Sequence, residues 1–287
     1  MKVKSFVFIA GDKRQLYAAK ATQSEGYKVY ICGFDKLDED WGIEKCTIKN
    51  SAELGDCFVL PMPLTKDGVS LNSPYSEENI SIKELAATLA SHRVFCSMKN
   101  KLTAVEPKWA GGNIYDYSIR EEFAVANAVP SAEGAIEVAM REYPGTVHGS
   151  RCLVAGFGRI GKVLSKMLDG LGAEVIVAAR KRADLALISA LGYKALELSE
   201  LITCPKPDLV FNTAPALIFG AKILAKVCRN SIVIDLASAP GGVDFDSAQR
   251  LGVKTIHALS LPGRVAPKCA GEVIKTTIFN MLEEDEQ

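Results

Sequence analysis

The chain has 287 residues, of which 48% are hydrophobic and 24% charged, so it is long enough for two domains and too apolar to be disordered. Its 34 basic and 34 acidic residues cancel and its pI is near 6.8, which leaves no basic surplus to bind nucleic acid or an anionic membrane. No apolar run approaches the length of a membrane span, and the short run before Gly11 is typical of a first strand rather than of a signal peptide.

Eight cysteines are distributed along the chain without a C-x-x-C or another metal-ligand spacing. Most of them lie in apolar runs, so we expect buried free thiols rather than ligands or disulfides. This usage fits a reducing, cytoplasmic compartment, and we expect no metal site.

The first hundred residues alternate short apolar runs with helical patterns, which predicts an α/β domain with a mostly parallel sheet. We expect strands at 4–10, 28–33, 57–60 and 93–97, helices from the turn at 11–15 to about 26 and at 81–91, and a polar loop at 64–75. Ser81 and Glu84 have the spacing of a capping box at the start of the second helix.

Asp12 and Arg14 follow the first expected strand at its carboxyl end, where ligands bind to parallel sheets. Arg14 could hold a substrate carboxylate with two hydrogen bonds, and Asp12 could orient Arg14 or act as a base. The alternative is that Asp12 only caps the following helix.

Residues 106–117 contain glycines and aromatic residues and are interpreted as a loop. Residues 118–140 have a helical composition interrupted at Pro130, and we expect them to connect two domains. Glu133 lies in this segment and could act as a general acid or base if it is buried. The alternative is an exposed glutamate in a first helical turn, which the helix dipole favours.

The pattern G-x-G-x-x-G follows an apolar run at 151–155 and precedes a helical pattern at 160–171 and a second apolar run at 173–179. A strand, a glycine-rich turn, a helix and a second strand form the context in which this motif binds the pyrophosphate of a dinucleotide. The expected cofactor contacts are Gly156, Phe157, Gly158, Arg159, Ile160 and Gly161. The alternative is a glycine-rich turn that binds no ligand.

The second of these strands ends in Arg180, Lys181 and Arg182, where an NAD-binding domain would place an acidic residue against the ribose. Three cations at this position favour a 2′-phosphate, so we expect NADP(H) as cofactor, with NAD(H) as the alternative. A basic turn exposed to solvent would give the same pattern.

Further apolar runs predict strands at 194–198, 208–211, 231–236 and 253–257, and the chain ends in a helix at 269–284. Because ligands lie beyond the carboxyl ends of parallel strands, the turns after two of these strands are additional cofactor candidates. These residues are Asn212, Thr213, Ala214, Pro215, Asp235, Leu236 and Ala237, and ordinary polar turns are the alternative. His257 is the one histidine of three at this edge, which makes it the candidate for general acid–base work.

Six motifs in this order resemble the A-subunit family of dipicolinate synthases. They are GDKRQ at 11–15, PSAEGAIEVAM at 130–140, VHGSRCLVAGFGRIG at 147–161, AARK at 178–181, DLASAPGGVDF at 235–245 and LPGRVAPKCAG at 261–271. The resemblance runs nearly from end to end, although residues 38–80 give little to match.

The resemblance implies an oxidoreductase subunit of a spore-forming bacterium that acts in the mother-cell cytoplasm during sporulation, together with a flavoprotein-like B-subunit. The two subunits would convert 4-hydroxy-tetrahydrodipicolinate, a small dicarboxylate, to dipicolinate. We also expect a homo-oligomer. Two alternatives stay open: a D-2-hydroxyacid dehydrogenase-like enzyme with another substrate, and a subunit that binds nucleotide and substrate while the B-subunit performs the redox chemistry.

The two-domain organisation also resembles D-2-hydroxyacid dehydrogenases and adenosylhomocysteinase, in which the C-terminal helix returns to the first domain. We therefore expect an α/β protein with a flavodoxin-like N-terminal substrate domain at 1–117 and a connecting helical segment at 118–144. A Rossmann NAD(P)-binding domain would follow at 145–266, and a helix at 267–287 would pack on the first domain.

Overall fold

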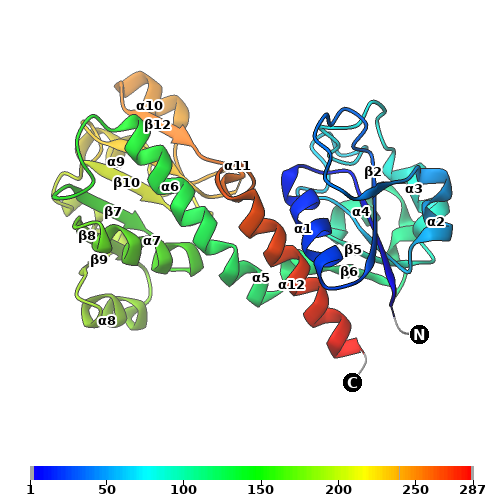
Figure 1. The fold of residues 1–287 in the computed structure, drawn as a ribbon. Helices are drawn as coiled ribbons and strands as arrows, with labels where there is room; N and C mark the ends of the chain where they lie inside the picture. Colours follow the sequence, from blue (N-terminus) through cyan, green and yellow to red (C-terminus); the bar gives the residue numbers. More distant parts are fainter. Residues whose placement is uncertain (1–2, 239, 286–287) are drawn as a thin grey trace. The chain divides into compact units, whose positions relative to one another are not determined.

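The computed structural model describes residues 3–238 and 240–285, which form two units, each built on a six-stranded parallel sheet (Figure 1). Unit 1 contains the residues up to Asn127 together with those from Ala266 onward, and unit 2 contains Ala128–Val265. Both units are α/β, as the alternation of apolar runs and helical patterns predicts.

The sheet of unit 1 has the strand order β3-β2-β1-β4-β5-β6. Its strands are β1 (Ser5–Ile9), β2 (Lys28–Cys32), β3 (Glu44–Lys45), β4 (Cys57–Val59), β5 (Arg93–Cys96) and β6 (Ile114–Asp116). When the two-residue β3 is left out and the other five strands are renumbered in chain order, the order becomes 2-1-3-4-5. This is the arrangement of flavodoxin-like folds, so the predicted fold class is confirmed. The order reverses between β1 and β4, and the carboxyl ends of these two strands form the switch point where ligands bind in such sheets.

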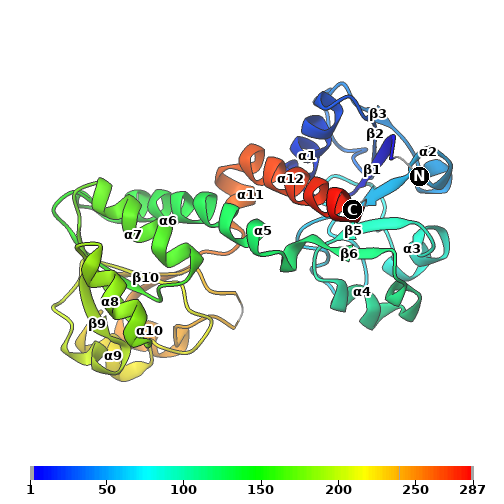
Figure 2. The ribbon, with the colours of Figure 1, turned by 90° about the horizontal axis from the view of Figure 1, so that it is seen from below.

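Helices cover both faces of this sheet, and their bounds are α1 (Lys13–Ser24), α2 (Ile48–Leu54), α3 (Ile82–Leu89), α4 (Lys99–Val105), α5 (Glu121–Ala126) and α12 (Pro267–Asp285), with 3-10 turns η1 (Pro107–Ala110) and η2 (Tyr117–Ile119). The face that carries Phe6 and Phe8 packs against α1 and α12, and the face that carries Val7 and Ile9 packs against α2, α3 and α4 (Figure 2). The last helix of the chain therefore belongs to unit 1, which confirms its predicted return to the first domain.

The sheet of unit 2 has the order β12-β11-β10-β7-β8-β9, the doubly wound order of dinucleotide-binding domains. Its strands are β7 (Arg151–Ala155), β8 (Glu174–Ala179), β9 (Lys194–Glu197), β10 (Leu209–Asn212), β11 (Ile232–Asp235) and β12 (Lys254–His257). Each lies within one or two residues of its predicted position. The switch point lies between β7 and β10, so the turns after these strands face each other.

The helices of unit 2 are α6 (Ala128–Glu142), α7 (Arg159–Gly170), α8 (Arg182–Ala190), α9 (Ala221–Lys226), α10 (Phe245–Leu251) and α11 (Leu261–Val265), with a 3-10 segment η3 (Leu198–Thr203). Figure 2 shows α6 and α7 on one side of the sheet and α9 and α10 on the other. The apolar face predicted for the helix after the glycine motif is present, with Leu164 and Leu168 fully buried against the sheet.

The sequence-based expectation contained none of the short helices α2, α4, α8, α9 and α10. It also differs from the structure at two short strands and one helix break. The predicted loop at 106–117 contains the 3-10 turn η1 and the strand β6, and β3 has only two residues, too few for a periodic signal. The helical segment at 118–144 is divided at Asn127 rather than at Pro130, and the boundary between the units falls within it. Pro130 is the third residue of α6, where its missing N–H has no intrahelical partner to lose.

Six of the eight cysteines are buried, and Cys46 and Cys269 are half-buried. No helix in the described part of the chain combines the length and the apolar character that crossing a bilayer requires. Within residues 3–238 and 240–285, no group of three or more His, Cys, Asp or Glu side chains is arranged to hold a metal ion.

Candidate functional site

The turn between β7 and α7 fixes the three glycines of the motif in three different ways. Gly156 has φ +103°, a conformation that L side chains rarely adopt, and a Cβ there would lie 2.5 Å from the Thr213 hydroxyl. A Cβ on Gly161 would overlap the carbonyl oxygen of Gly156, so this glycine lets α7 pack closely against the turn. A Cβ on Gly158 would meet no atom within 4 Å, so the backbone at this point borders open space.

Gly158 is also the N-cap residue of α7. Because glycine has no side chain that could accept a hydrogen bond from the first helical turn, this end of the helix presents backbone N–H groups to an anion. An open approach at Gly158 and a helix N-terminus behind it are the features that a pyrophosphate requires. The geometry of this turn therefore fits a bound dinucleotide.

A cavity of about 380 Å³ lies over this turn and extends to the end of β8. It is lined by Gly156, Phe157, Gly158, Lys162, Ala178, Ala179, Arg180, Lys181, Asp184, Leu198, Thr213, Ala214 and Pro215. Eight of these were predicted as cofactor contacts from the sequence. The cavity thus brings the glycine turn, the cationic strand end and the turn after β10 into one site, because all three follow neighbouring parallel strands.

Arg180 and Lys181 line this cavity and are exposed, so their charges are available to a ligand. Arg182 is the first residue of α8 and lies outside the lining of the cavity as described. Of the glycine-motif residues, Arg159, Ile160 and Gly161 also lie outside this lining, on the first turn of α7.

Lys162, Asp184 and Leu198 line the cavity but were not identified from the sequence. The ammonium group of Lys162 lies 5.5 Å from the ring centre of Phe157, beside the glycine turn. A cation in the first turn of a helix opposes the helix dipole, and this unfavourable placement was the available signal in the sequence that Lys162 could face an anion.

Asn212 and Asp235 end neighbouring strands and are both wholly buried. The Asn212 side-chain amide donates to Asp235 Oδ1 at 2.7 Å, and Asp235 also accepts from the backbone N–H groups of Ala237 at 3.1 Å and Gly242 at 2.7 Å. The Asn212 Oδ1 accepts from the N–H of Ala214 at 3.3 Å. These side chains, predicted as cofactor contacts, are thus engaged in fixing the turns after β10 and β11.

The other residues predicted in these turns differ in burial. Thr213 and Ala214 are half-buried and Pro215 is exposed, and all three line the cavity. Leu236 is half-buried and packs against the core, and Ala237 is buried. The cavity lining as described contains neither of these two.

His257 ends β12 directly beside Asp235 in the strand register. Its Nε2 lies 3.1 Å from the carbonyl oxygen of Ala237, and its ring lies 5.3 Å from that of Phe245. The imidazole therefore contacts a backbone carbonyl, because the neighbouring Asp235 carboxylate is occupied by amide donors. Glu133 is exposed, as in the alternative considered from the sequence, but it lies on the second turn of α6 rather than on the first.

The carboxyl edge of the sheet in unit 1 holds Asp12 and Arg14. Asp12 is the N-cap of α1 and accepts from the N–H of Arg14 at 3.0 Å. The Arg14 guanidinium is buried; its Nε donates to Asp12 Oδ1 at 3.0 Å, and its Nη2 donates to Asp12 Oδ2 at 2.7 Å and to the carbonyl of Met62 at 2.5 Å. Asp12 therefore both caps the helix and orients Arg14.

The same edge of the sheet contains two residues with a strained backbone and one buried phenol. Ala10 and Met98, which follow β1 and β5, both have φ of +57°, a conformation that concentrates at functional sites. The Tyr117 hydroxyl donates to the carbonyl of Leu60 at 3.2 Å, and burial raises the pKa of Tyr117 well above its ordinary value. Tyr117 thus remains a neutral phenol at this edge of the sheet.

Comparison with known proteins supports both units of this description. Residues 5–117 match the family described as the N-terminal domain of the dipicolinate synthase A-subunit, and residues 125–245 match the NAD-binding domain of D-isomer specific 2-hydroxyacid dehydrogenases. The chain is 32% identical over 281 residues to the dipicolinate synthase A-subunit of Bacillus subtilis (strain 168), covering 96% of this chain and 95% of that protein. The chain belongs to the A-subunit family of dipicolinate synthases.

A crystal structure from this family, the dipicolinate synthase A-subunit of Bacillus halodurans, superimposes with a TM-score of 0.88 at 32% identity, covering 97% of each chain. A transhydrogenase from Sinorhizobium meliloti shares the fold alone, with a TM-score of 0.71 at 17% identity over 97% of this chain and 93% of that one. Membership of the A-subunit family, together with the NAD-binding domain, supports an oxidoreductase role for the chain.

Proposed function

We propose that this chain is the NADP-dependent A-subunit of a dipicolinate synthase and acts on 4-hydroxy-tetrahydrodipicolinate. The reaction removes one water from the ring C–OH group and two hydrogens from the ring, which leaves the aromatic dicarboxylate. A nicotinamide cofactor, when bound, accepts one of these hydrogens as hydride. The proposal rests on the family to which the chain belongs and on the cavity over the glycine turn.

The residues that would hold the cofactor follow from this cavity. The open backbone at Gly158 and the N-terminus of α7 would hold the pyrophosphate, and Thr213 would line the site opposite the glycine turn. We assign Asn212 and Asp235 to positioning the two turns that border the cofactor, because their polar atoms bond to those turns. The remaining glycine-motif residues and Leu236 and Ala237 would contribute through the backbone and packing.

The preference for NADP(H) over NAD(H) rests on one observation, the pair Arg180 and Lys181 at the end of β8. Both cations are exposed in the cavity at the place where a 2′-phosphate would lie. Asp184 also lines the cavity, from the first turn of α8, and an NAD-specific site would use such a carboxylate to hold the ribose hydroxyl groups. Arg180 and Lys181 therefore favour NADP(H), whereas Asp184 favours NAD(H).

Titration of the purified chain with NADPH and NADH, followed by nicotinamide fluorescence, tests this assignment. We expect NADPH to bind more tightly, and Arg180→Ala to weaken NADPH by about tenfold to a hundredfold while leaving NADH unchanged, as loss of a charge-assisted bond predicts. Arg182→Ala is the matched control, because it removes the same charge outside the cavity lining. Equal binding of both cofactors would contradict the NADP assignment.

We propose that unit 1 binds the substrate and that Arg14 meets one of its carboxylates. Nε and Nη2 of Arg14 are held by Asp12 and Met62, and Nη1 is the atom assigned to the substrate. Asp12 would then act by holding Arg14 in place. His257 is the proposed proton-transfer group; Glu133, exposed in this structure, is a second candidate that a bound substrate would have to bury. A changed pH profile of turnover in His257→Asn or Glu133→Gln tests each of them.

A second candidate function is to bind nucleotide and substrate while the flavoprotein-like B-subunit performs the redox step. It is favoured over a D-2-hydroxyacid dehydrogenase by the contact of His257 with a carbonyl rather than a carboxylate. Assays of the chain alone and in mixture with the B-subunit distinguish these functions, since a chain that only binds its ligands forms no NADPH by itself. We also propose that the chain forms a homo-oligomer, which analytical sedimentation tests. Its proposed location in the mother-cell cytoplasm is tested by imaging a fluorescent fusion in sporulating cells.

A further inference from the structure

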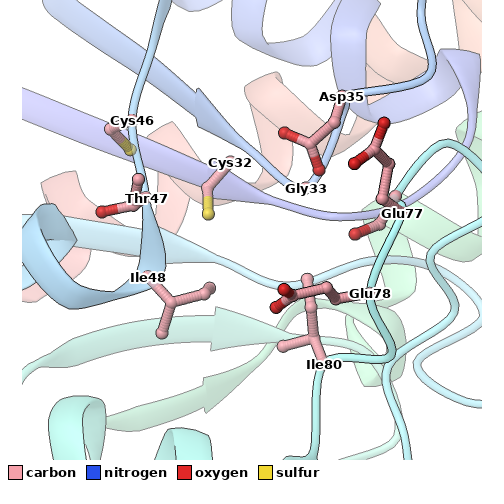
Figure 3. Close-up of a pocket in the computed structure, with 10 residues that line it drawn as sticks. Cys32, Gly33, Asp35, Cys46, Thr47, Ile48, Glu77, Glu78 and Ile80 are labelled. Carbon is pink, nitrogen blue, oxygen red and sulfur yellow. The ribbon is translucent and has the colours of Figure 1, made fainter.

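A second cavity, of about 300 Å³, lies in unit 1 at the carboxyl end of β2. Two cysteines line it, Cys32 at the end of β2 and Cys46 just after β3. Figure 3 shows the two thiol groups directed toward the same space, with Asp35, Glu77 and Glu78 around it. The proposed NADP site lies in unit 2, so this cavity is a separate feature.

The strand register places the two cysteines side by side. Tyr30 pairs with Glu44 and Ile31 with Lys45, and the N–H of Cys46 donates to the carbonyl of Ile31 at 2.9 Å. Continuing this register sets Cys46 beside Cys32, with both side chains on one face. Neighbouring strands lie about 4.8 Å apart, which is within the Cα separation of about 4.4–6.8 Å that a disulfide spans.

The two thiols are also chemically different. Cys32 is buried, whereas Cys46 is partly exposed in the cavity. The interaction between the two thiol groups lowers the pKa of Cys46 and raises that of Cys32. By contrast, burial raises the pKa of Cys57 to about 12 and that of Cys152 to about 11. Cys46 is thus the more nucleophilic member of a pre-aligned pair.

We propose that Cys32 and Cys46 form a redox-active thiol pair that a hydroperoxide oxidises reversibly to an intramolecular disulfide. The Cys46 thiolate attacks the peroxide O–O bond, taking up one oxygen to become a sulfenic acid while the other oxygen leaves, with a proton, as water. The Cys32 thiol then attacks the Cys46 sulfur, the S–S bond forms and a second water leaves. The two thiols lose two electrons in total, and hydrogen peroxide takes up the same two electrons.

The lining of the cavity selects the charge of the oxidant. Asp35, Glu77 and Glu78 contribute three carboxylates, and the described lining contains no lysine or arginine. The negative electrostatic potential of these carboxylates does not oppose the entry of a neutral oxidant such as hydrogen peroxide, whereas it repels an anionic disulfide. We therefore expect hydrogen peroxide to be a better oxidant of the pair than the anionic reagent dithiodipropionate.

The experiment treats the purified, reduced full chain with a small excess of hydrogen peroxide. We expect the count of titratable thiols to fall from eight to six and the intact mass to fall by about 2 Da, with both changes reversed by dithiothreitol. Tryptic digestion should then release the peptide 29–36 linked to the peptide 46–49. An unchanged thiol count, over-oxidation of Cys46 without a bridge, or linkage of another pair would overturn the proposal.

Two variants separate this chemistry from general thiol reactivity. In Cys32→Ser, the Cys46 sulfenic acid has no partner, so dimedone should trap it on peptide 46–49. Cys269→Ser removes the other cysteine that is not fully buried, and it should form the bridge as the wild type does. If Cys32→Ser does not fold, the mass and peptide measurements on the wild type still decide the proposal.

Discussion

The hydroxyl oxygen of Thr213 lies 2.5 Å from the position that a Cβ on residue 156 would occupy. The same hydroxyl donates to the carbonyl of Ala155 at 3.1 Å, so it links the turn after β10 to the turn after β7 across the switch point. Gly156 is thus required both by its own backbone conformation and by a side chain 57 positions later in the sequence.

Substitution of Gly156 should damage folding and binding together. Gly156→Ala forces an L residue into positive φ and into Thr213, and we expect a loss of about 2–4 kcal/mol in unfolding free energy, since such backbone strain alone costs about 1–3 kcal/mol. Denaturant unfolding measures it. Adding Thr213→Ala should recover part of the loss because the clash partner is gone, and strictly additive effects would contradict the contact.

Substitution of Gly158 should separate binding from folding. A Cβ at this position meets nothing within 4 Å, so Gly158→Ala should change the unfolding free energy by only about 0.5 kcal/mol. The methyl group would instead occupy the space proposed for the pyrophosphate, and NADPH affinity should fall at least about tenfold. Parallel unfolding and fluorescence titrations test this, and wild-type affinity in the variant would count against the pyrophosphate site.

Asp235 should be needed for the stability of unit 2. Asp235→Ala removes the acceptor of one N–H of the Asn212 amide and of the backbone N–H groups of Ala237 and Gly242, while the other amide N–H keeps the Ala214 carbonyl. We expect a loss of about 2–4 kcal/mol, since each buried unsatisfied donor costs about 1–3 kcal/mol. The exposed Asp246 of α10 is the control, and its alanine variant should unfold within about 0.5 kcal/mol of the wild type.

Substitution of Arg14 by lysine should reduce both the stability of the protein and its affinity for substrate. Arg14→Lys keeps the charge but replaces the planar guanidinium by a single nitrogen, which cannot reproduce the paired bonds of Nε and Nη2 to Asp12, so we expect about 1–2 kcal/mol less stability. If Arg14 meets a substrate carboxylate as proposed, KM should also rise about tenfold or more. Lys13→Ala, which removes an exposed ion pair with Glu39, should leave KM unchanged.

Asp67 should make part of the stability dependent on pH. Its carboxylate accepts from the backbone N–H groups of Ser70 and Val69 and from the Thr65 hydroxyl, and these bonds lower the pKa of Asp67 from 3.8 to about 2. The depressed pKa means that the contribution is complete above pH about 4 and disappears as the pH falls toward 2. The difference in unfolding free energy between wild type and Asp67→Asn should shrink over this window, and a constant difference would contradict it.

Local patterns in the sequence were sufficient to predict the fold class and most of the strands. The apolar runs and helical periodicities predicted both α/β units, and the positions of Gly156, Gly158 and Gly161 predicted the tight turn between a strand and a helix that the structure contains. These signals lie within a few residues of one another, so backbone preference and burial determine them without long-range information. The break attributed to Pro130 was wrong because proline is compatible with a first helical turn.

Only the tertiary structure decided which polar groups meet. Asn212 and Asp235 looked like ligand contacts because both end strands at the correct edge, yet the register of β10 and β11 buries them against each other. Cys46 lies beside Cys32 through the same kind of long-range pairing, here between β2 and β3. The sequence by itself determined the elements and the glycine turn, since these depend on local backbone energetics. The partners of its buried polar side chains depend on strand register between distant segments, which only the folded sheet specifies.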